Sequence, residues 1–404
     1  MKAMGPMHQW EFRARFRRHA FGWRSQPATQ RVREAVTEIK HAARRDPVLG
    51  AEGAVLLLER ISPALENVDS SSGAIGTAVN KALDALVPLI TEVVADVQLR
   101  DGWLDRLWAA IEADQIPYLD RLPDYWGDLC GSKELAAVWA DRLNGITRLA
   151  LSPDPTVRGY YCGTSACLSA LYRAERYQEI VELLDHDDII WPYRRWAVKA
   201  LGALGRTSEA VQYAESCRGP WTSDYDVDRV CEDILLVSGL VEDAYLYGLR
   251  ANRAGTYVAT FRAVARKHPH KTASEILHDL VRTMPGDEGK WFAAAKEAGL
   301  YDEALALASA SACDPRTLTR AARELAISQP DFAIGAGLLA LYWLVYGQGY
   351  EITGADVWAA YTATIGVAQT RGLVNEVRER IRRVVAAEVP GGLVSRSLGR
   401  ELGL

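Results

Sequence analysis

The chain has 404 residues, of which 49% are hydrophobic and 25% are charged. This balance is ordinary for a folded protein and excludes a disordered chain, while the length favours two domains or a repeat array over one compact core. The formal net charge of −5 excludes a molecule that binds polyanions through its overall charge.

The first predicted element covers residues 10–24, where five arginines are mixed with five aromatic residues. A helix at 100° per residue places four rings within one narrow sector and the arginines on its two flanks. The sector contains Phe12, Phe16, His19 and Trp23. Trp10 and Phe21 fall on the opposite side. A platform for stacking bases would instead present rings and cations on one face, so we expect an amphipathic helix docked into a core.

Two alternatives stay open for this end of the chain. One is a surface for nucleic acid or an acidic partner, and the other is a helix that lies on a membrane surface. Residues 1–45 hold eleven basic residues against three acidic ones, which supports the partner alternative. The candidate surface consists of Arg13, Arg15, Arg17, Arg18, Arg24, Arg31 and Arg33.

Residues 1–150 are predicted to form an N-terminal helical domain. Apolar residues at steps of three and four predict a helix over residues 74–97, with a buried stripe that runs from Ile75 to Val94. No convincing run of alternating strand residues is found, so every element of this domain is expected to be helical.

Tryptophans and aspartates in this domain leave one enzymatic alternative. Helical-repeat DNA glycosylases combine such residues, and Trp103, Asp105 and Trp108, or Asp124 and Trp126, could be assigned to that chemistry. The simpler interpretation makes Trp103 and Trp108 core and rim residues of one amphipathic helix. Because the motifs of nucleophilic hydrolases, phosphate loops and zinc proteases are absent, we predict no catalytic residue and favour a protein without enzymatic activity.

No segment has the ligand pattern of a metal site, and we predict no metal and no other cofactor. Asp224, Asp226 and Asp228 begin like a calcium loop, but Arg229 stands where glycine is needed and Leu235 where a bidentate glutamate is needed. The six cysteines are sparse and have no matched ligand pairs. They favour a reduced, cytoplasmic protein, as does a basic N-terminus without the apolar core of a signal peptide.

The second half of the chain repeats. Helix starts that pair an acidic residue with a small or apolar one recur at spacings of 28 to 34 residues. The acids are Glu179, Glu209, Asp243, Glu275 and Glu303. A tight turn after a first helix explains Gly205, Gly239 and Gly299. A close crossing of the second helix explains Ala210, Ala244 and Ala304.

From about residue 155 to 390 the chain therefore resembles a degenerate tetratricopeptide repeat. A weaker resemblance is to the helical region that follows the zinc finger in bacterial SWIM-type proteins. The cysteine and histidine pairs of that finger are absent, so this likeness implies no ligand and no function. We predict an all-α fold, with a tetratricopeptide-like solenoid of helical hairpins over residues 151–404 behind the domain of residues 1–150.

Aromatic and basic residues recur at the starts of predicted first helices. Solenoids present these helices on a concave face, and aromatic residues and arginines are common anchors of protein interfaces. The candidate partner-binding residues are Trp191, Tyr193, Arg194, Arg195, Trp221, Lys290 and Trp291. The equal alternative is that Trp191 and Trp291 fill the space between helices. We predict a scaffold that binds a protein or peptide, with a nucleic-acid-binding protein as the alternative.

Residues 332–350 carry no charge. Their continuous apolar part ends near Tyr346, which is short for a bilayer span. We predict a buried central helix and no membrane partner.

Overall fold

The computed structural model describes residues 8–186, 188–253 and 255–404. This part of the chain forms 22 α-helices and two 3-10 helices, and its only strand-like pairing is an isolated bridge between Gly219 and Thr222. The predicted all-α class is confirmed. The chain divides into two compact units, Met1–Ile234 (unit 1) and Leu235–Leu404 (unit 2).

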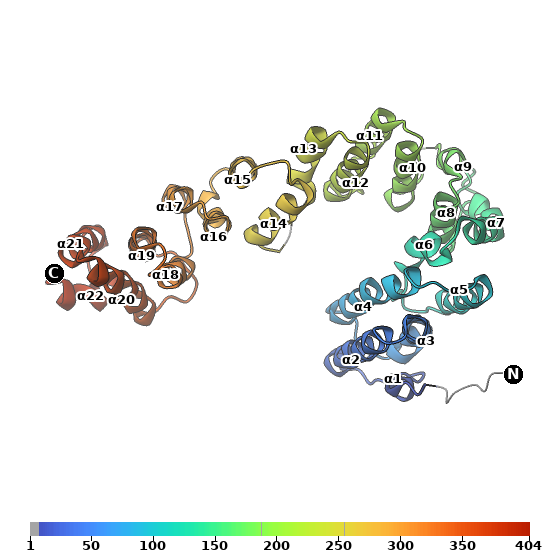
Figure 1. Ribbon diagram of the computed structural model, residues 1–404, viewed down its shortest axis with the longest axis horizontal. Helices are drawn as coiled ribbons and strands as arrows, with labels where there is room; N and C mark the ends of the chain where they lie inside the picture. The colour runs from blue at the N-terminus through green and yellow to red at the C-terminus, as the bar shows by residue number, and fades with distance from the viewer. Residues whose placement is uncertain (1–7, 187, 254) are drawn as a thin grey trace. The chain divides into compact units, whose positions relative to one another are not determined.

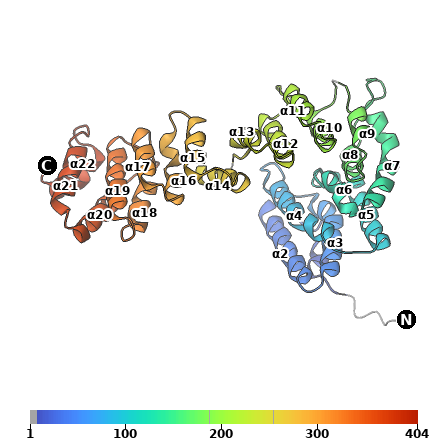
Figure 2. The same cartoon turned by 45° about the horizontal axis from the view of Figure 1, so that its top comes forward.

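Unit 1 is a series of helices, most of which pack against their neighbours in the sequence (Figures 1 and 2). Its elements are α1 (Glu11–Arg15), α2 (Ser25–Ala43), α3 (Pro47–Leu65), α4 (Ala74–Thr91), α5 (Val97–Glu112), η1 (Leu122–Tyr125), α6 (Trp126–Cys130), α7 (Lys133–Ala150), α8 (Thr164–Arg173), α9 (Tyr177–Leu183), α10 (Trp191–Ala203), α11 (Thr207–Ser216) and most of α12 (Asp224–Val237).

The predicted helix over residues 10–24 is wrong in its extent. The helix α1 ends at Arg15, and the chain then turns through His19, whose φ of 54° lies in the left-handed region. The backbone N–H of His19 donates to the carbonyl of Pro63 in α3 at 2.9 Å, a contact that no local pattern encodes. Trp10, which is extended before α1, and Phe21, which follows the turn, both pack against the core instead of lying opposite the core stripe as predicted.

The four rings of the predicted core stripe differ in their burial. Phe12 and Phe16 are buried as predicted, whereas Trp23 is 71% exposed and His19 is exposed. The arginines of this segment lie outside the core. The segment therefore uses its rings for packing and leaves its cations at the surface.

The single helix predicted over residues 74–97 is wrong in its extent, because α4 ends at Thr91 and α5 begins at Val97. Arg100 ends the first one, because its buried guanidinium donates to the carbonyls of Ile90 and Val93 at 3.0 and 2.6 Å. Asp96 starts the second one by accepting from the N–H of Leu99 at 2.8 Å. Val94 consequently lies in the connection and is 94% exposed instead of buried.

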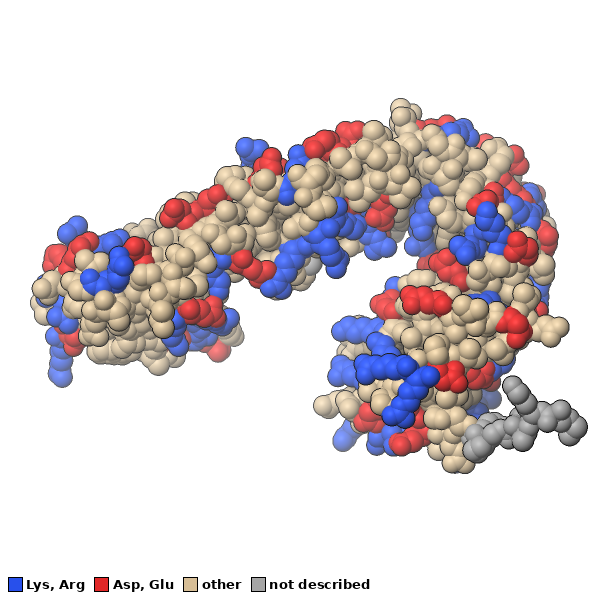
Figure 3. Space-filling view, viewed as in Figure 1, with Lys and Arg blue, Asp and Glu red and all other residues tan. Residues whose placement is uncertain are grey.

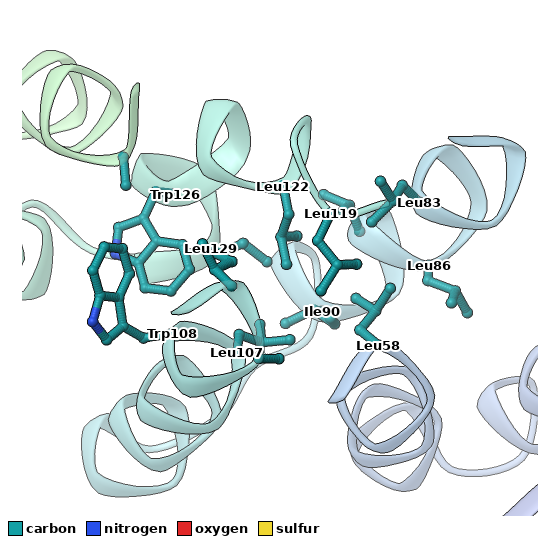
Figure 4. Packing of buried hydrophobic residues seen from close by; sticks show 14 of the residues in the cluster. Leu58, Leu83, Leu86, Ile90, Leu107, Trp108, Leu119, Leu122, Trp126 and Leu129 are labelled. Carbon is teal, nitrogen blue, oxygen red and sulfur yellow. The ribbon is translucent and has the colours of Figure 1, made fainter. Parts of the chain in front are cut away.

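The core of unit 1 is continuous from Trp10 to Ala200. Figure 4 shows leucines and isoleucines from α3, α4, α5, η1 and α6 converging, with Leu58, Ile90, Leu107 and Leu122 among them. Close packing of this kind fixes the relative positions of the elements that line the site described below.

Helical hairpins in both units share one turn geometry. Gly205, Gly239 and Gly299 all have a φ of 76°, which a side chain would strain. In each turn the glycine N–H donates to the carbonyl three residues earlier and the next N–H donates to the carbonyl five residues before it. Glu175 occupies the equivalent place after α8 with a φ of 60° and the same two bonds.

The second helices of these hairpins cross close to their neighbours. Ala210, Ala244 and Ala304 are fully buried, as expected for small residues at a crossing. The recurring acids lie in the first turns of α9, α11, α13, α15 and α17, where they complement the positive end of the helix dipole. The predicted tetratricopeptide-like helical repeat is confirmed.

Unit 2 continues with helical pairs and ends on a packed bundle. Its elements are α13 (Val241–Ala251), α14 (Tyr257–Lys267), α15 (Ala273–Arg282), η2 (Glu288–Trp291), α16 (Phe292–Glu297), α17 (Tyr301–Ala310), α18 (Pro315–Glu324), α19 (Pro330–Val345), α20 (Gly354–Arg371), α21 (Val374–Val385) and α22 (Leu393–Leu402). Figures 1 and 2 show α18, α19 and α20 side by side, and α19 also packs on α17, α21 and α22. The predicted buried central helix at this place is confirmed.

Among the described residues one helix, Ala74–Thr91, is long and apolar enough to cross a membrane by length and composition alone. Within unit 1 this helix contributes Ile75, Leu83 and Leu86 to the core.

The two packed units meet at residues 234 and 235, whereas the predicted start of the repeats lies near residue 150. Packing does not interrupt the chain at residue 150, because α7 and α8 lie against each other on either side of it. Where the repeats begin stays a prediction.

Candidate functional site

A charged groove lies on one face of unit 1. It consists of two adjoining hollows of about 610 and 410 Å³ that share residues of η1, α10 and α12. The helices α8, α10 and α12 are the first helices of successive hairpins, so the groove follows the face that such helices share.

The first wall is held by a close approach between α6 and α8. A Cβ on Gly127 would lie 2.3 Å from the carbonyl oxygen of Ser169, so no other residue fits there. The hydroxyl of Ser169 accepts from the N–H of Gly127 at 3.0 Å and donates to the carbonyl of Asp124 at 2.9 Å. This pairing holds the backbone of Asp124 at the edge of the groove.

The second wall is a stripe along α10. Trp191, Arg195 and Lys199 are four residues apart and therefore lie on one side of the helix. All three line the groove. The guanidinium of Arg195 forms an ion pair with Asp124 at 2.5 Å, which joins α10 to η1 across the hollow.

Aromatic rings form an adjoining part of the lining. The ring of Tyr172 lies 5.2 Å from that of Tyr177 and 5.8 Å from that of Trp196, measured between centroids. The ammonium of Lys199 lies 4.5 Å from the centroid of the Trp196 ring, a cation–π distance. Tyr172 and Tyr177 are half-buried and offer ring surface beside these charged groups, whereas Trp196 is 5% exposed.

Both signs of charge line the groove. Its basic residues are Arg121, Lys133, Arg173, Arg195, Lys199 and Arg229. Its acidic residues are Asp120, Asp124, Asp128, Glu175 and Asp226. The near balance of charges suits a ligand with separate polar groups better than a polyanion.

Three of the predicted partner-binding residues line this groove. Trp191 is largely buried in its wall, while Tyr193 and Arg195 are half-buried. Burial raises the pKa of the Tyr193 hydroxyl. The prediction for these residues is not tested by any bound partner.

The other predicted residues lie elsewhere. Arg194 points toward α11, where its guanidinium contacts the Cys217 sulfur at 3.5 Å and lies over the Tyr213 ring. Trp221 is 97% exposed in the connection before α12. Lys290 and Trp291 belong to unit 2.

In unit 2, Trp291 fills the space between helices. It is 2% exposed and its ring stacks edge-on against Tyr257 at 4.8 Å. Lys290 is paired with Asp287 at 2.9 Å. The interhelical alternative therefore describes the position of Trp291, and a buried ring has no surface to offer a partner.

Sequence reasoning missed Lys199, Arg229, Tyr172 and Asp124 as members of the groove. A signal for Lys199 was present, because it continues the four-residue spacing from Trp191 through Arg195. Asp124 lies 71 residues from its partner Arg195, so the pairing depends on how η1 packs on α8.

The basic N-terminal surface is partly neutralised. All seven predicted arginines are exposed. Arg15 and Arg31 contact Glu34 at 3.2 and 2.6 Å, and Arg18 lies 3.9 Å from Glu66. Figure 3 shows acidic side chains interspersed among the basic ones at this end of unit 1. Trp10, Phe12 and Phe16 are in the core, so three of the rings of this segment are withdrawn from base stacking, while Trp23 is exposed beside Arg24.

Apart from Asp124, which lines the groove, the residues considered for a glycosylase are structural. Trp103, Trp108 and Trp126 are buried, and the Trp103 indole N–H donates to Glu52 at 2.7 Å. Asp105 forms an ion pair with Arg142 at 2.8 Å. These contacts place the three rings in the core of unit 1.

Cysteine and metal chemistry have little support. All six cysteines are free, and five are buried. Burial raises the pKa of Cys130 to about 12 and that of Cys167 to about 11, which makes both poor nucleophiles. Among the residues that the structure describes, no three His, Cys, Asp or Glu side chains are grouped to hold a metal ion.

No protein-family model matches the chain, and no curated protein sequence is significantly similar to it. Among solved structures the chain is similar to a chain in the crystal structure of the APC/C hetero-tetramer Cut9–Hcn1, with 15% identity and a TM-score of 0.23. The similarity covers 87% of this chain and 76% of that one. This similarity is too distant to transfer a function.

Proposed function

We propose that this protein is a non-catalytic helical-repeat scaffold that binds an extended segment of another protein in the groove of unit 1. The observation that carries the proposal is the groove itself, because successive first helices line it with aromatic and charged side chains. Helical repeats commonly use such faces for binding. Six free cysteines support a reducing, cytoplasmic location.

An extended segment fits the shape of the groove better than a compact ligand. The two hollows adjoin along α10, and half-buried rings line both of them, Tyr172 and Tyr177 in one and Tyr193 in the other. An extended partner could contact the aromatic and the charged residues of the groove one after another along its length. Aromatic and arginine contacts of this kind dominate many interfaces.

The test is affinity capture from a lysate of the host, with nuclease-treated and untreated samples compared by mass spectrometry. A groove variant exchanges two exposed rim charges, Asp226→Arg with Arg229→Glu, and so keeps the net charge. A second variant reverses the N-terminal charges, Arg13→Glu, Arg17→Glu and Arg24→Glu.

We expect a stoichiometric protein partner that survives nuclease, is lost with the groove variant and is retained with the N-terminal variant. A partner that is lost only with the N-terminal variant, or that disappears after nuclease, contradicts the proposal and favours the nucleic-acid alternative.

A further inference from the structure

The groove contains a cation that its own acids do not neutralise. Lys199 lies half-buried on α10, one turn after Arg195, with its ammonium on the face of the Trp196 ring. Arg195 is paired with Asp124, and Lys133 is paired with Glu175. Within the described ranges no carboxylate lies at ion-pair distance from Lys199.

A second unpaired cation stands at the rim. Arg229, on α12, is exposed and lines both hollows. Over the part of the chain that the structure describes, it too has no carboxylate within ion-pair distance. Because Lys199 is half-buried without a carboxylate partner, an anion bound in the groove would stabilise its charge, and the exposed Arg229 adds a second positive charge nearby.

The electrostatics of Lys199 agree with this geometry. Burial lowers the pKa of its ammonium, and the neighbouring charges of Arg195 and Arg229 lower it further. Asp124 and Asp233 raise the pKa of Lys199 but do not offset this lowering. A bound anion would raise the pKa of Lys199.

We propose that Lys199 and Arg229 together bind a side-chain carboxylate of an acidic protein segment, with the stem of that side chain against Tyr172. This inference rests on the function proposed above and names the chemistry of the partner. The half-buried ring of Tyr172 accepts methylene groups, and the two cations accept the carboxylate at the end of them.

The acids of the groove favour a single carboxylate over a phosphate or a nucleic acid. Asp124, Asp128 and Asp226 line the same hollow as Lys199. A dianionic phosphate or a phosphodiester backbone would meet these charges along its length, whereas one carboxylate contacts only the cationic spot. Among the described residues Asp128 and Asp226 form no ion pair, so they remain available to a basic neighbour in the same segment.

Selection from a random peptide display library on the intact protein tests this inference. We expect enriched peptides to share one Asp or Glu position. The variant Lys199→Glu should reverse the preference at that position toward Lys or Arg, while Lys81→Glu, on the exposed surface of α4, should leave it unchanged.

The enriched peptide then allows a double-mutant cycle. Lys199→Ala should weaken its binding by about tenfold or more, as expected for a charged hydrogen bond, and Lys199→Arg should restore most of it. Replacing the peptide carboxylate by the amide should weaken wild type but have little further effect on Lys199→Ala. Equal thermal unfolding of the variants shows that they fold.

The outcomes separate the two proposals. Peptides that bind in the groove without a shared acidic position overturn this inference and leave the scaffold proposal standing. Failure to enrich any peptide overturns both. Tighter binding of a phosphopeptide or an oligonucleotide than of the acidic peptide, lost in Lys199→Ala, assigns the cations to phosphate and also overturns the inference.

Discussion

Lys199 holds its charge in surroundings that disfavour it, and this gives the groove a pH dependence that ordinary surface lysines lack. Charged and titratable groups from several elements surround it. They are Arg195 on α10, Arg121, Asp124 and Tyr125 at η1, Asp128 on α6, Lys133 on α7, Tyr172 and Arg173 on α8, Glu175 and Tyr177 at the start of α9, and Asp226, Arg229 and Asp233 on α12. Burial, together with the charges of Arg195 and Arg229, holds the pKa of Lys199 below its usual value of 10.5.

The first prediction concerns the affinity for an acidic peptide between about pH 6 and about pH 10. A bound carboxylate stabilises the ammonium, so the pKa of Lys199 is higher in the complex than in the free protein. Affinity should therefore be greatest below the free-protein pKa and fall as the pH rises through it. Fluorescence anisotropy with a labelled peptide measures this directly.

Lys199→Arg is the control, because arginine stays protonated throughout this range. Its affinity should be independent of pH where that of the wild type falls. The same decline in both proteins would show that another group titrates.

At the scale of the element, the hairpin turn is the unit that local chemistry specifies. Gly205 has open space around the position of a Cβ, so its requirement for glycine is conformational and not steric. Gly145, in the middle of α7, also has open space but adopts ordinary helical geometry. The two glycines therefore isolate backbone conformation as the variable.

We expect Gly205→Ala and Gly145→Ala to have opposite effects. Alanine at Gly205 must adopt a left-handed conformation and should lower the free energy of unfolding by about 1 kcal/mol. Alanine at Gly145 should raise it by roughly 0.5–1 kcal/mol, because it removes backbone freedom from the unfolded chain. Urea unfolding of each variant gives the two values. A loss at both sites would mean that side-chain space, and not φ, decides.

The elements also show what sequence could and could not predict. The hairpin turns and small crossing residues follow from local rules, so Gly205 and Ala210 could be assigned from the sequence. The end of α1 could not, because it depends on a hydrogen bond from His19 to Pro63. The break between α4 and α5 depends on Arg100, which also bonds the carbonyl of Leu129 at 3.0 Å.

At the scale of the whole molecule, charge is mixed over both units (Figure 3). The net charge of −5 and the carboxylates beside the N-terminal arginines work against sequence-independent binding of nucleic acid.

The groove could be predicted only in part from the sequence. Periodicity assigns Trp191 and Arg195 to one face, but the acids that oppose them come from elements far away in the sequence.

We therefore predict a shallow dependence of partner binding on salt. A protein that makes six to ten phosphate contacts loses about 10³–10⁵ in affinity between about 50 and 200 mM salt. A site with one carboxylate and apolar contacts should lose less than about tenfold over that range. Titration of an acidic peptide and of an oligonucleotide at several salt concentrations distinguishes the two. A steep decline for the peptide would show that several ion pairs, and not one, hold it.

The left-handed Glu175 has a consequence for anyone who engineers repeats of this type. Averaging the hairpin turns of this chain would place glycine there, as at Gly205, Gly239 and Gly299. That substitution relieves backbone strain, yet it removes the carboxylate that pairs with Lys133 at the edge of the groove. A consensus version would gain stability and lose part of what distinguishes this hairpin from its neighbours. The departure from glycine at Glu175 is therefore specific to this hairpin, and a consensus sequence would remove its ion pair with Lys133.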